Sequence, residues 1–316
     1  MMTSNHDARL IPGNEVSGDG GVNGRHRVRT DPSVGWLAVG ALGAAAAAVL
    51  IRRRRPPATN AYYVALGSSF AAGLGLGQRA PGSPLVSQRG VDGYPQQLAR
   101  LLRVPSFTDM TSSGSTVRQV LRGGQMLLGP QIDALGPDTR LVTLTAGGND
   151  VGYVGDLTFM ALRNEGGLVG TILKGVWQGP KRTREREFRE LDANLRATLR
   201  EIRRRSPLAR IVVATYPAIL PDALGCRTLG ITEGQAAAMR AVADELARVT
   251  RVAAGSTGAA VVDMAVTSKG HDACSKDPWV NGFRPEHGAS FHPNREGAEA
   301  TAKAIVIEVE RLGVAR

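Results

Sequence analysis

The chain has 316 residues, of which 42% are hydrophobic and 21% are charged; this suffices for one large core and excludes a wholly disordered protein. Lys and Arg outnumber Asp and Glu by 39 to 28, which gives a net charge of +11. Because the sequence carries no zinc-ligand spacing, helix-turn-helix signal or aromatic RNA-binding stretch, we expect no nucleic-acid partner; an anionic membrane surface is the better use of the basic charge.

The first 60 residues differ in composition from the rest and divide into three parts. Residues 1–33 are polar and rich in Gly, Asn and Arg, which predicts a disordered tail. Residues 34–51 form an uncharged run of 18 residues, just long enough to cross a bilayer, so we expect a transmembrane or signal-anchor helix there. Residues 52–60 begin with four arginines and two prolines, which predicts a basic linker and argues against a cleaved signal peptide.

Two signals disagree about the side of the membrane on which the folded part lies. The four arginines after the apolar run favour a cytoplasmic position for that flank, since basic flanks tend to stay inside. A disulfide would instead require an oxidising compartment. We expect the folded part to be extracytoplasmic, and either membrane-anchored or secreted.

In chain order, residues 61–316 alternate between strand-like and helix-like segments. Strands are expected over 62–66, 105–110, 141–146, 210–217 and 259–264. Helices are expected over 94–102, over 183–205, from 232 onward and over 295–312. This alternation predicts one α/β domain over 61–316, built as a flavodoxin-like three-layer sandwich with a central parallel sheet.

Small or polar residues follow the expected strands, where ligands bind in sheets of this kind. Ser69 follows the first strand, Gly114 follows the second, and Asn149 follows the third. His292 stands directly before the last helix. Each of these turns is also common in proteins without any catalytic role there, but their order at successive strand ends favours one shared site.

Together these residues supply the groups that ester hydrolysis requires. A serine hydroxyl attacks only when a base takes its proton, and neutral histidine is the base suited to pH 7. The N–H groups of Ser69 and Gly114 and the side-chain amide of Asn149 are donors for the oxyanion formed by the attack. We therefore predict Ser69 as nucleophile, His292 as general base, and these three donors as an oxyanion hole.

With these residues, the chain from about residue 62 onward resembles the SGNH or GDSL hydrolase superfamily. The family's blocks correspond to GSSFAAG at 67–73 for Gly-Asp-Ser-x-x-x-Gly, to Gly114, to 147–150 for Gly-x-Asn-Asp, and to His292-Pro293. The resemblance implies the SGNH hydrolase fold and an acyl-enzyme on Ser69, and it implies no metal and no organic cofactor.

Two positions depart from the family pattern. Ser68 stands where the family has Asp before the nucleophile, and Ala289 stands where the triad acid lies, three residues before the histidine. Some members of the similar branch use a Ser–His dyad whose histidine is oriented by a main-chain carbonyl. We therefore predict a dyad in which the carbonyl of Ala289 or Ser290 orients His292. The alternative acids are Glu286 and Asp277.

Cys226 and Cys274 are too few for a disulfide scaffold and lack metal-ligand spacing. From their position in loops alone, one long-loop disulfide is favoured over two free buried thiols. The stretches YPAILP at 216–221 and HDACSKDPWVNG at 271–282 are similar to secreted esterases of actinobacterial type. Paired cysteines are usual in that branch, so the resemblance implies a Cys226–Cys274 disulfide.

The sequence therefore predicts a serine carboxylic-ester hydrolase of the esterase or lipase type, acting on a small-molecule or lipid ester. Residues 157–177 are rich in large apolar side chains, which predicts either a cover that binds an acyl chain or an ordinary core helix. Polysaccharide deacetylation, acyl transfer and a non-enzymatic tethered binding function are alternatives. No feature of the sequence indicates an oligomeric state.

Overall fold

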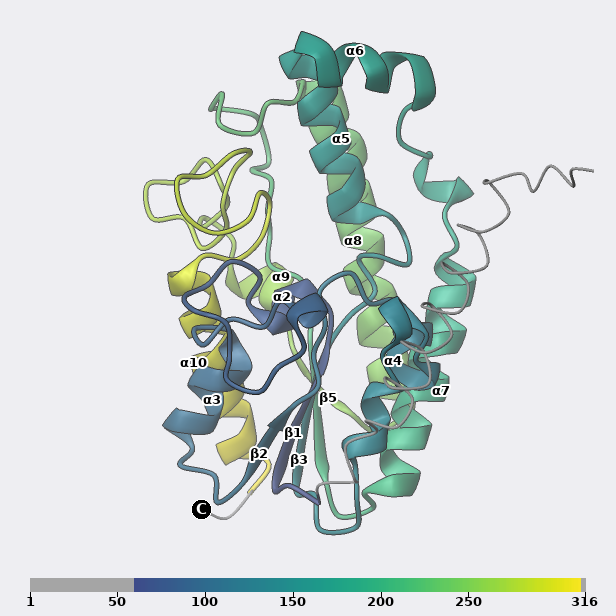
Figure 1. Cartoon of the computed structure of the whole chain (residues 1–316), viewed down its shortest axis with the longest axis vertical. Coiled ribbons are helices and arrows are strands. Elements are labelled where there is room, and N and C mark those ends of the chain that lie inside the picture. Colours follow the sequence, from purple (N-terminus) through teal and green to yellow (C-terminus); the bar gives the residue numbers. More distant parts are fainter. Residues whose placement is uncertain (1–59, 314–316) are drawn as a thin grey trace, which may run out of the picture. The chain divides into compact units, whose positions relative to one another are not determined.

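A parallel sheet forms the centre of the protein. The computed structural model describes residues 60–313. Within them, five strands lie in the order β2-β1-β3-β4-β5, and every neighbouring pair is parallel (Figure 1). The strands are β1 (Tyr63–Gly67), β2 (Phe107–Asp109), β3 (Leu141–Thr145), β4 (Arg210–Ala214) and β5 (Ala260–Val262). This order is that of flavodoxin-like sheets, so the predicted fold class is confirmed.

The inner strands are buried because helices cover both faces of the sheet. All residues of β1 and β3 are buried, as largely apolar parallel strands require. Their side chains alternate between the two faces: Val64 and Leu66 point into one core, and Tyr63 and Ala65 point into the other. The sequence of β1 thus serves two hydrophobic cores at once.

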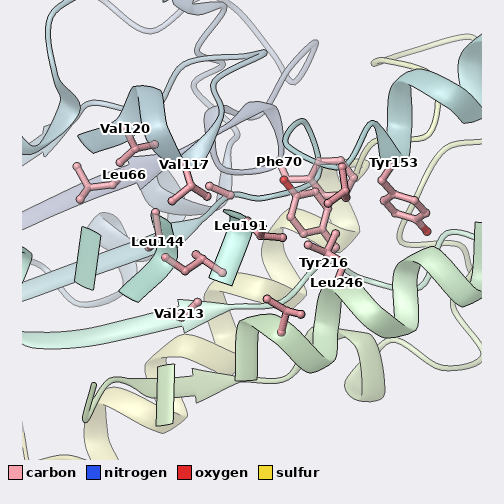
Figure 2. Close-up of a cluster of buried hydrophobic side chains, with 14 of the residues drawn as sticks. Leu66, Phe70, Val117, Val120, Leu144, Tyr153, Leu191, Val213, Tyr216 and Leu246 are labelled. Atoms are coloured by element: carbon pink, nitrogen blue, oxygen red, sulfur yellow. The ribbon is translucent and has the colours of Figure 1, made fainter. Parts of the chain in front are cut away.

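Helices form the two outer layers of the sandwich. One layer contains α4 (Val117–Arg122), α7 (Phe188–Arg205) and α8 (Glu233–Ser256), and the other contains α3 (Tyr94–Leu101) and α10 (Arg295–Arg311) (Figure 1). Figure 2 shows the core under the first layer, where Leu144 and Val213 of the sheet share a buried cluster with Leu191 of α7 and Leu246 of α8. The three-layer arrangement is the predicted one.

Four further helices follow the carboxyl ends of the strands within residues 60–313. α2 (Ser69–Ala72) follows β1, α5 (Tyr153–Glu165) and α6 (Gly167–Val176) follow β3, and α9 (Met264–Thr267) follows β5. The turns between these strands and helices therefore collect at one edge of the sheet, where the sequence predicts the site.

One helix begins later than its apolar spacing predicts. α7 starts at Phe188, whereas the prediction placed its start at residue 183. Thr183–Glu185 forms a separate 3-10 turn. The chain bends between them because Arg186 turns inward, where its guanidinium donates to the carboxylate of Asp156 and to the carbonyl of Val151.

The prediction of a transmembrane protein is corrected by the structure. None of the helices within residues 60–313 is long and apolar enough to cross a bilayer. The longest, α8, has 24 residues, but charged side chains recur along it, among them Arg240, Asp244 and Arg248. The segment 34–51, on which the prediction rested, lies outside the described residues, as do the predicted tail over 1–33 and residues 52–59 of the predicted linker.

Candidate active site

Ser69 lies in a tight turn between β1 and α2. The turn requires glycine at position 67, where φ is +145° and a Cβ atom would lie 2.4 Å from the carbonyl oxygen of Thr145. The N–H of Ser68 donates to the same carbonyl at 2.9 Å, which ties the turn to β3. Ser69 is the first residue of α2, so its own N–H is not used by the helix.

The side chain of Gln131 holds the end of β1 from one side. Its Oε1 accepts the N–H of Gly67 at 2.8 Å, and its Nε2 donates to the carbonyl of Gly67 at 3.0 Å. Nε2 also lies 3.1 Å from Oγ of Ser115, and the N–H of Ser112 donates to the Gly67 carbonyl at 3.0 Å. These bonds join the turn that bears Ser69 to the turn that bears Gly114.

His292 lies at the end of a long irregular segment between α9 and α10. Its N–H donates to the carbonyl of Ala289 at 3.3 Å, and its carbonyl accepts the N–H of Asn281 at 2.9 Å. Asn294 then caps α10, because its Oδ1 accepts the N–H of Gly297 at 2.8 Å. The backbone is thus fixed on both sides of the histidine.

The structure brings Ser69 and His292 together, although 223 positions separate them in the chain. Nε2 of His292 lies 2.8 Å from Oγ of Ser69, and Nδ1 lies 2.7 Å from the carbonyl oxygen of Ser290. A carbonyl only accepts hydrogen bonds, so Nδ1 carries the hydrogen and Nε2 of the neutral ring accepts from the serine. Burial lowers the pKa of His292, while its bond to Ser290 opposes this more weakly. The ring is therefore neutral at pH 7.

The alternative acids do not reach the histidine. The carboxylate of Glu286 is almost fully exposed and lies beside His287, and the carbonyl of Asp277 accepts from the ring of His271. Within residues 60–313, no carboxylate is hydrogen-bonded to His292. Of the two carbonyls considered from the sequence, the one that faces Nδ1 belongs to Ser290.

The three expected oxyanion donors lie on turns that hydrogen bonds hold together. One N–H of the Asn149 side chain donates to the carbonyl of Ser115 at 2.9 Å, which leaves its second N–H for a ligand. In the described part of the chain, the N–H groups of Ser69 and Gly114 donate to no other protein group. Donors that are fixed but unused suit the stabilisation of a developing negative charge.

Asp150 holds the Asn149 turn against α4. Both of its carboxylate oxygens accept the N–H of Val117, at 3.0 and 3.1 Å. Burial raises the pKa of Asp150 to about 6, and the bond to Val117 opposes that rise. The carboxylate therefore has a structural partner of its own, and it is not hydrogen-bonded to His292.

The hydroxyl of Tyr216 links two of these turns, a contact that the sequence analysis missed. It accepts the N–H of Gly148 at 3.1 Å and lies 2.9 Å from Oγ of Ser68. Burial raises the pKa of Tyr216 to about 12, so the hydroxyl keeps its proton at neutral pH. The tyrosine ring packs on Phe70 at 4.4 Å between centroids, and Phe70 packs on His292 at 4.9 Å. The available signal was its position just after β4, at a strand end like the other site residues.

A disulfide joins Cys226 and Cys274, the two cysteines of the chain. It links the segment after β4 to the segment that leads to His292. Nearby, the N–H of Phe283 donates to the carbonyl of Thr228 at 2.7 Å. Gly282 fits there because a Cβ atom would lie 2.6 Å from that same carbonyl oxygen. The loop that carries the histidine is therefore supported by a neighbouring loop and not by the sheet.

The apolar segment 157–177 divides into two unlike helices. α5 contributes Leu157 and Met160 to the core, where both are fully buried, so this half behaves as an ordinary core helix. α6 packs on α5 at a corner formed by Gly166 and Gly167, and most of its large apolar side chains are exposed. In the described residues, no group of three or more His, Cys, Asp or Glu side chains is arranged to hold a metal ion.

Comparisons with known proteins find relatives in sequence and in fold. The GDSL-like lipase/acylhydrolase family matches residues 65–300. Lipase 2 of Streptomyces coelicolor is 33% identical over 252 residues, which cover 76% of this chain and 83% of the relative. The structure of an extracellular lipase from Streptomyces rimosus is 28% identical with a TM-score of 0.62, covering 78% of this chain and 97% of that one. Phospholipase A1 from Streptomyces albidoflavus is 28% identical with a TM-score of 0.60, covering 78% and 98%.

Proposed function

Because the chain belongs to the GDSL-like lipase/acylhydrolase family and is a serine carboxylic-ester hydrolase, we propose that Ser69 is its nucleophile and His292 its general base. The observation that carries this proposal is the 2.8 Å approach of Nε2 to Oγ, with Nδ1 directed at a main-chain carbonyl. This is the contact that proton transfer from serine to histidine requires.

The proposed reaction has two steps. In the first, Oγ of Ser69 attacks the ester carbonyl carbon while Nε2 of His292 takes the hydroxyl proton. The histidine then gives this proton to the alcohol oxygen, the carbon–oxygen bond to the alcohol breaks, and an acyl-enzyme remains. In the second step, water attacks the acyl group, its proton passes to Nε2, and Oγ regains a proton as the acid leaves.

We assign the role of the missing acid to the carbonyl of Ser290. The carbonyl fixes the tautomer of His292 by accepting the hydrogen of Nδ1. It carries only a partial negative charge, so it stabilises the imidazolium less than a carboxylate would. We therefore expect slower turnover than a complete triad would give in the same site.

The proposed oxyanion hole consists of the N–H groups of Ser69 and Gly114 and the free side-chain N–H of Asn149. The bonds from Gln131 to the Ser69 turn and from Asn149 to Ser115 support it, because they hold its donors before substrate arrives. Removing one such donor typically lowers kcat by about 10²–10³-fold.

We propose that the enzyme cleaves lipid or small carboxylic esters outside the cytoplasm. The names of its relatives support the substrate class, since they include lipases and a phospholipase A1. The Cys226–Cys274 bond supports the location, because disulfides persist in oxidising compartments, and one relative is an extracellular lipase.

The test combines turnover with labelling of the nucleophile. In Ser69→Ala, kcat on p-nitrophenyl esters is expected to fall by at least about 10⁴-fold, and labelling by a fluorophosphonate probe should vanish. His292→Ala should lose both, since an unactivated serine does not react with the probe. Retained turnover in Ser69→Ala would reject the assignment.

Two control variants separate the proposed groups from their neighbours. Ser68→Ala removes the adjacent hydroxyl and should still be labelled at position 69. Ser290→Ala removes a side chain but keeps the carbonyl that faces Nδ1, so its turnover should stay close to that of the unchanged enzyme. A large loss of turnover in Ser290→Ala would contradict the role of the carbonyl.

A further inference from the structure

The helix α6 presents an apolar face to solvent. The exposed fractions are 79% for Leu168, 53% for Val169, 54% for Ile172 and 74% for Val176. At 3.6 residues per turn, these four side chains fall within about 100° of the helix circumference, so they form one continuous stripe. Figure 1 shows α6 lying across the end of α5 that is farthest from the sheet.

The opposite side of α6 packs against α5. Gly170 is its buried residue, and a Cβ atom there would lie 3.0 Å from the carbonyl of Leu162 on α5. The corner between the helices depends on Gly166 and Gly167, whose φ angles are +83° and +66°. The stripe therefore points away from the only large helix surface that α6 contacts among residues 60–313.

The surroundings of the stripe are basic. Residues 163–184 contain five Lys or Arg residues and one acidic residue, a net charge of +4. The single carboxylate, that of Glu165, is paired with Arg284 at 2.7 Å. Lys174, on α6 itself, is exposed and forms no ion pair within the described residues. Lys181, Arg182 and Arg184 are exposed and unpaired as well, but they lie nearer the start of α5, because the carbonyl of Lys181 accepts from the Arg186 guanidinium that binds Asp156. At the carboxyl end of α6, Trp177 packs against Phe159, which is itself 43% exposed.

We propose that α6 docks the enzyme on the surface of anionic lipid. An exposed apolar stripe on a helix that carries an unpaired cation, here Lys174, and that is followed by a basic segment is the arrangement with which interfacial helices enter the headgroup region of a membrane. The apolar side chains would lie among the acyl chains, and the cations would contact lipid phosphates. The proposal extends the proposed function, because it names the lipid surface on which the enzyme would find its ester substrate. Only this link to the substrate rests on the proposed function, since docking itself requires no turnover.

A second copy of the chain fits this face less well. A ten-residue helix is about 15 Å long and about 10 Å wide, so the stripe covers roughly 150 Å². A stable protein–protein interface buries about 800 Å² on each partner. The unpaired cations would also face their counterparts across a two-fold dimer, which adds repulsion, whereas an anionic surface complements them.

Docking through α6 leaves the proposed dyad open. α5 starts four residues after Asn149 and has 13 residues, so α6 lies about 20 Å along the helix from the oxyanion turn. The stripe is thus too far away to contact an ester bound at Ser69. We therefore expect changes in the stripe to affect lipid binding without affecting turnover of a water-soluble ester.

Binding is tested with the full chain and with vesicles that it cannot hydrolyse. The vesicles contain equal parts of ether-linked phosphatidylglycerol and phosphatidylcholine. The test variant is Leu168→Gln with Ile172→Gln, and the matched control is Leu208→Gln with Ile307→Gln, two apolar side chains that are 63% and 68% exposed elsewhere. The test variant should bind about tenfold more weakly, and the control should bind like the unchanged protein.

A second measurement locates the contact. Vesicles should slow amide hydrogen exchange over residues 167–177 and leave α10 unchanged. Raising the ionic strength from about 0.1 M to about 1 M, or using phosphatidylcholine alone, should weaken binding, because the cations then lose their attraction. Thermal unfolding verifies that both double variants are folded. The labelling of Ser69→Ala tests the proposed function and not the docking proposal, so the two can fail separately.

Three results would overturn the docking proposal. The first is equal vesicle binding by the test and control variants. The second is amide exchange over residues 167–177 that vesicles do not slow further, which would mean that the lipid surface does not contact α6. The third is a concentration-dependent dimer that the test variant abolishes.

Discussion

The two members of the proposed dyad are held in different ways. Ser69 follows a sheet strand by two residues, and bonds from Thr145 and Gln131 fix its turn directly to the sheet. His292 follows the last strand by 30 positions, in a segment supported by a disulfide, by neighbouring loops and by the start of α10. The nucleophile therefore depends on local backbone geometry, whereas the base depends on contacts between distant parts of the chain.

The largest expected effect comes from breaking the nucleophile's turn. In Gly67→Ala, the new Cβ would meet the Thr145 carbonyl at 2.4 Å, at a φ that favours glycine. We expect a loss of about 3 kcal/mol or more in the free energy of unfolding, with loss of turnover. Chemical denaturation measures it. Gly234→Ala is the control, because nothing lies within 4 Å of its Cβ position; similar behaviour of the two variants would contradict the close-approach argument.

Breaking the support of the histidine should cost somewhat less. The disulfide spans 48 positions, so replacing Cys226 and Cys274 together by Ala should lower the free energy of unfolding by about 2–4 kcal/mol. Turnover at low temperature should also fall, because the loop that carries His292 loses a tether. Thermal unfolding with and without a reducing agent checks this, since reductant should shift the unchanged protein and leave the double variant unaffected.

Tyr216→Phe weakens the link between the Ser69 turn and the turn that bears Asn149. This change leaves the buried Ser68 hydroxyl and the N–H of Gly148 without their partner, which should cost about 1–3 kcal/mol of stability. We expect kcat to fall while KM changes little, because the shifted turns bear the oxyanion donors.

The control for this variant is Tyr94→Phe. Its buried hydroxyl bonds to Thr145 at 3.0 Å, on the face of the sheet covered by α3 and α10. It should lose comparable stability but keep its kcat. An equal fall of kcat in both variants would mean that the effect of Tyr216 is one of stability alone.

The smallest expected effect is a shift of the acid limb of the kcat/KM pH profile to lower pH. Burial lowers the pKa of His292, and only the neutral ring accepts the serine proton. The ratio kcat/KM should therefore reach a plateau at neutral pH and fall about tenfold per pH unit in acid, with its midpoint below about 6.5. Because the pKa of His292 is lower in the folded chain than in the unfolded chain, the protein should also lose stability as the pH falls from about 6.5 through the pKa of the folded state.

Asp150 requires a control in this measurement, since burial raises its pKa to about 6. Asp150→Asn removes that titration and keeps an oxygen that accepts from Val117. The acid limb of kcat/KM should stay in place in this variant. If the acid limb of kcat/KM disappears in Asp150→Asn, the titration belongs to Asp150 and not to His292.

Much of the fold was predictable because it depends on local patterns. The apolar runs of β1, β3 and β4 predicted these strands to within a few residues, the capping box predicted the start of α8, and the expected last helix matches α10. The strand ends then indicated where Ser69, Gly114 and Asn149 would gather. The bend at Arg186 was not predictable, since it depends on a carboxylate 30 positions away.

The partners of the site residues were harder to predict than the residues themselves. The contact between Tyr216 and Ser68 spans 148 positions and leaves no trace in sequence spacing. The choice between the carbonyls of Ala289 and Ser290 depends on the backbone path around Phe291, which has a φ of +57°. The apolar composition of 157–177 did not reveal that α5 is buried and α6 is exposed, because that division depends on how the two helices meet.

The carbonyl that orients His292 belongs to the peptide unit and not to a side chain. A triad carboxylate disappears with a single amino-acid replacement, but a main-chain oxygen is kept by every residue that can adopt the same backbone at position 290. The contact of residue 290 with the histidine therefore does not depend on its side chain, whose hydroxyl oxygen instead accepts the N–H of Arg284. The orientation of the base is thus encoded in the shape of a loop.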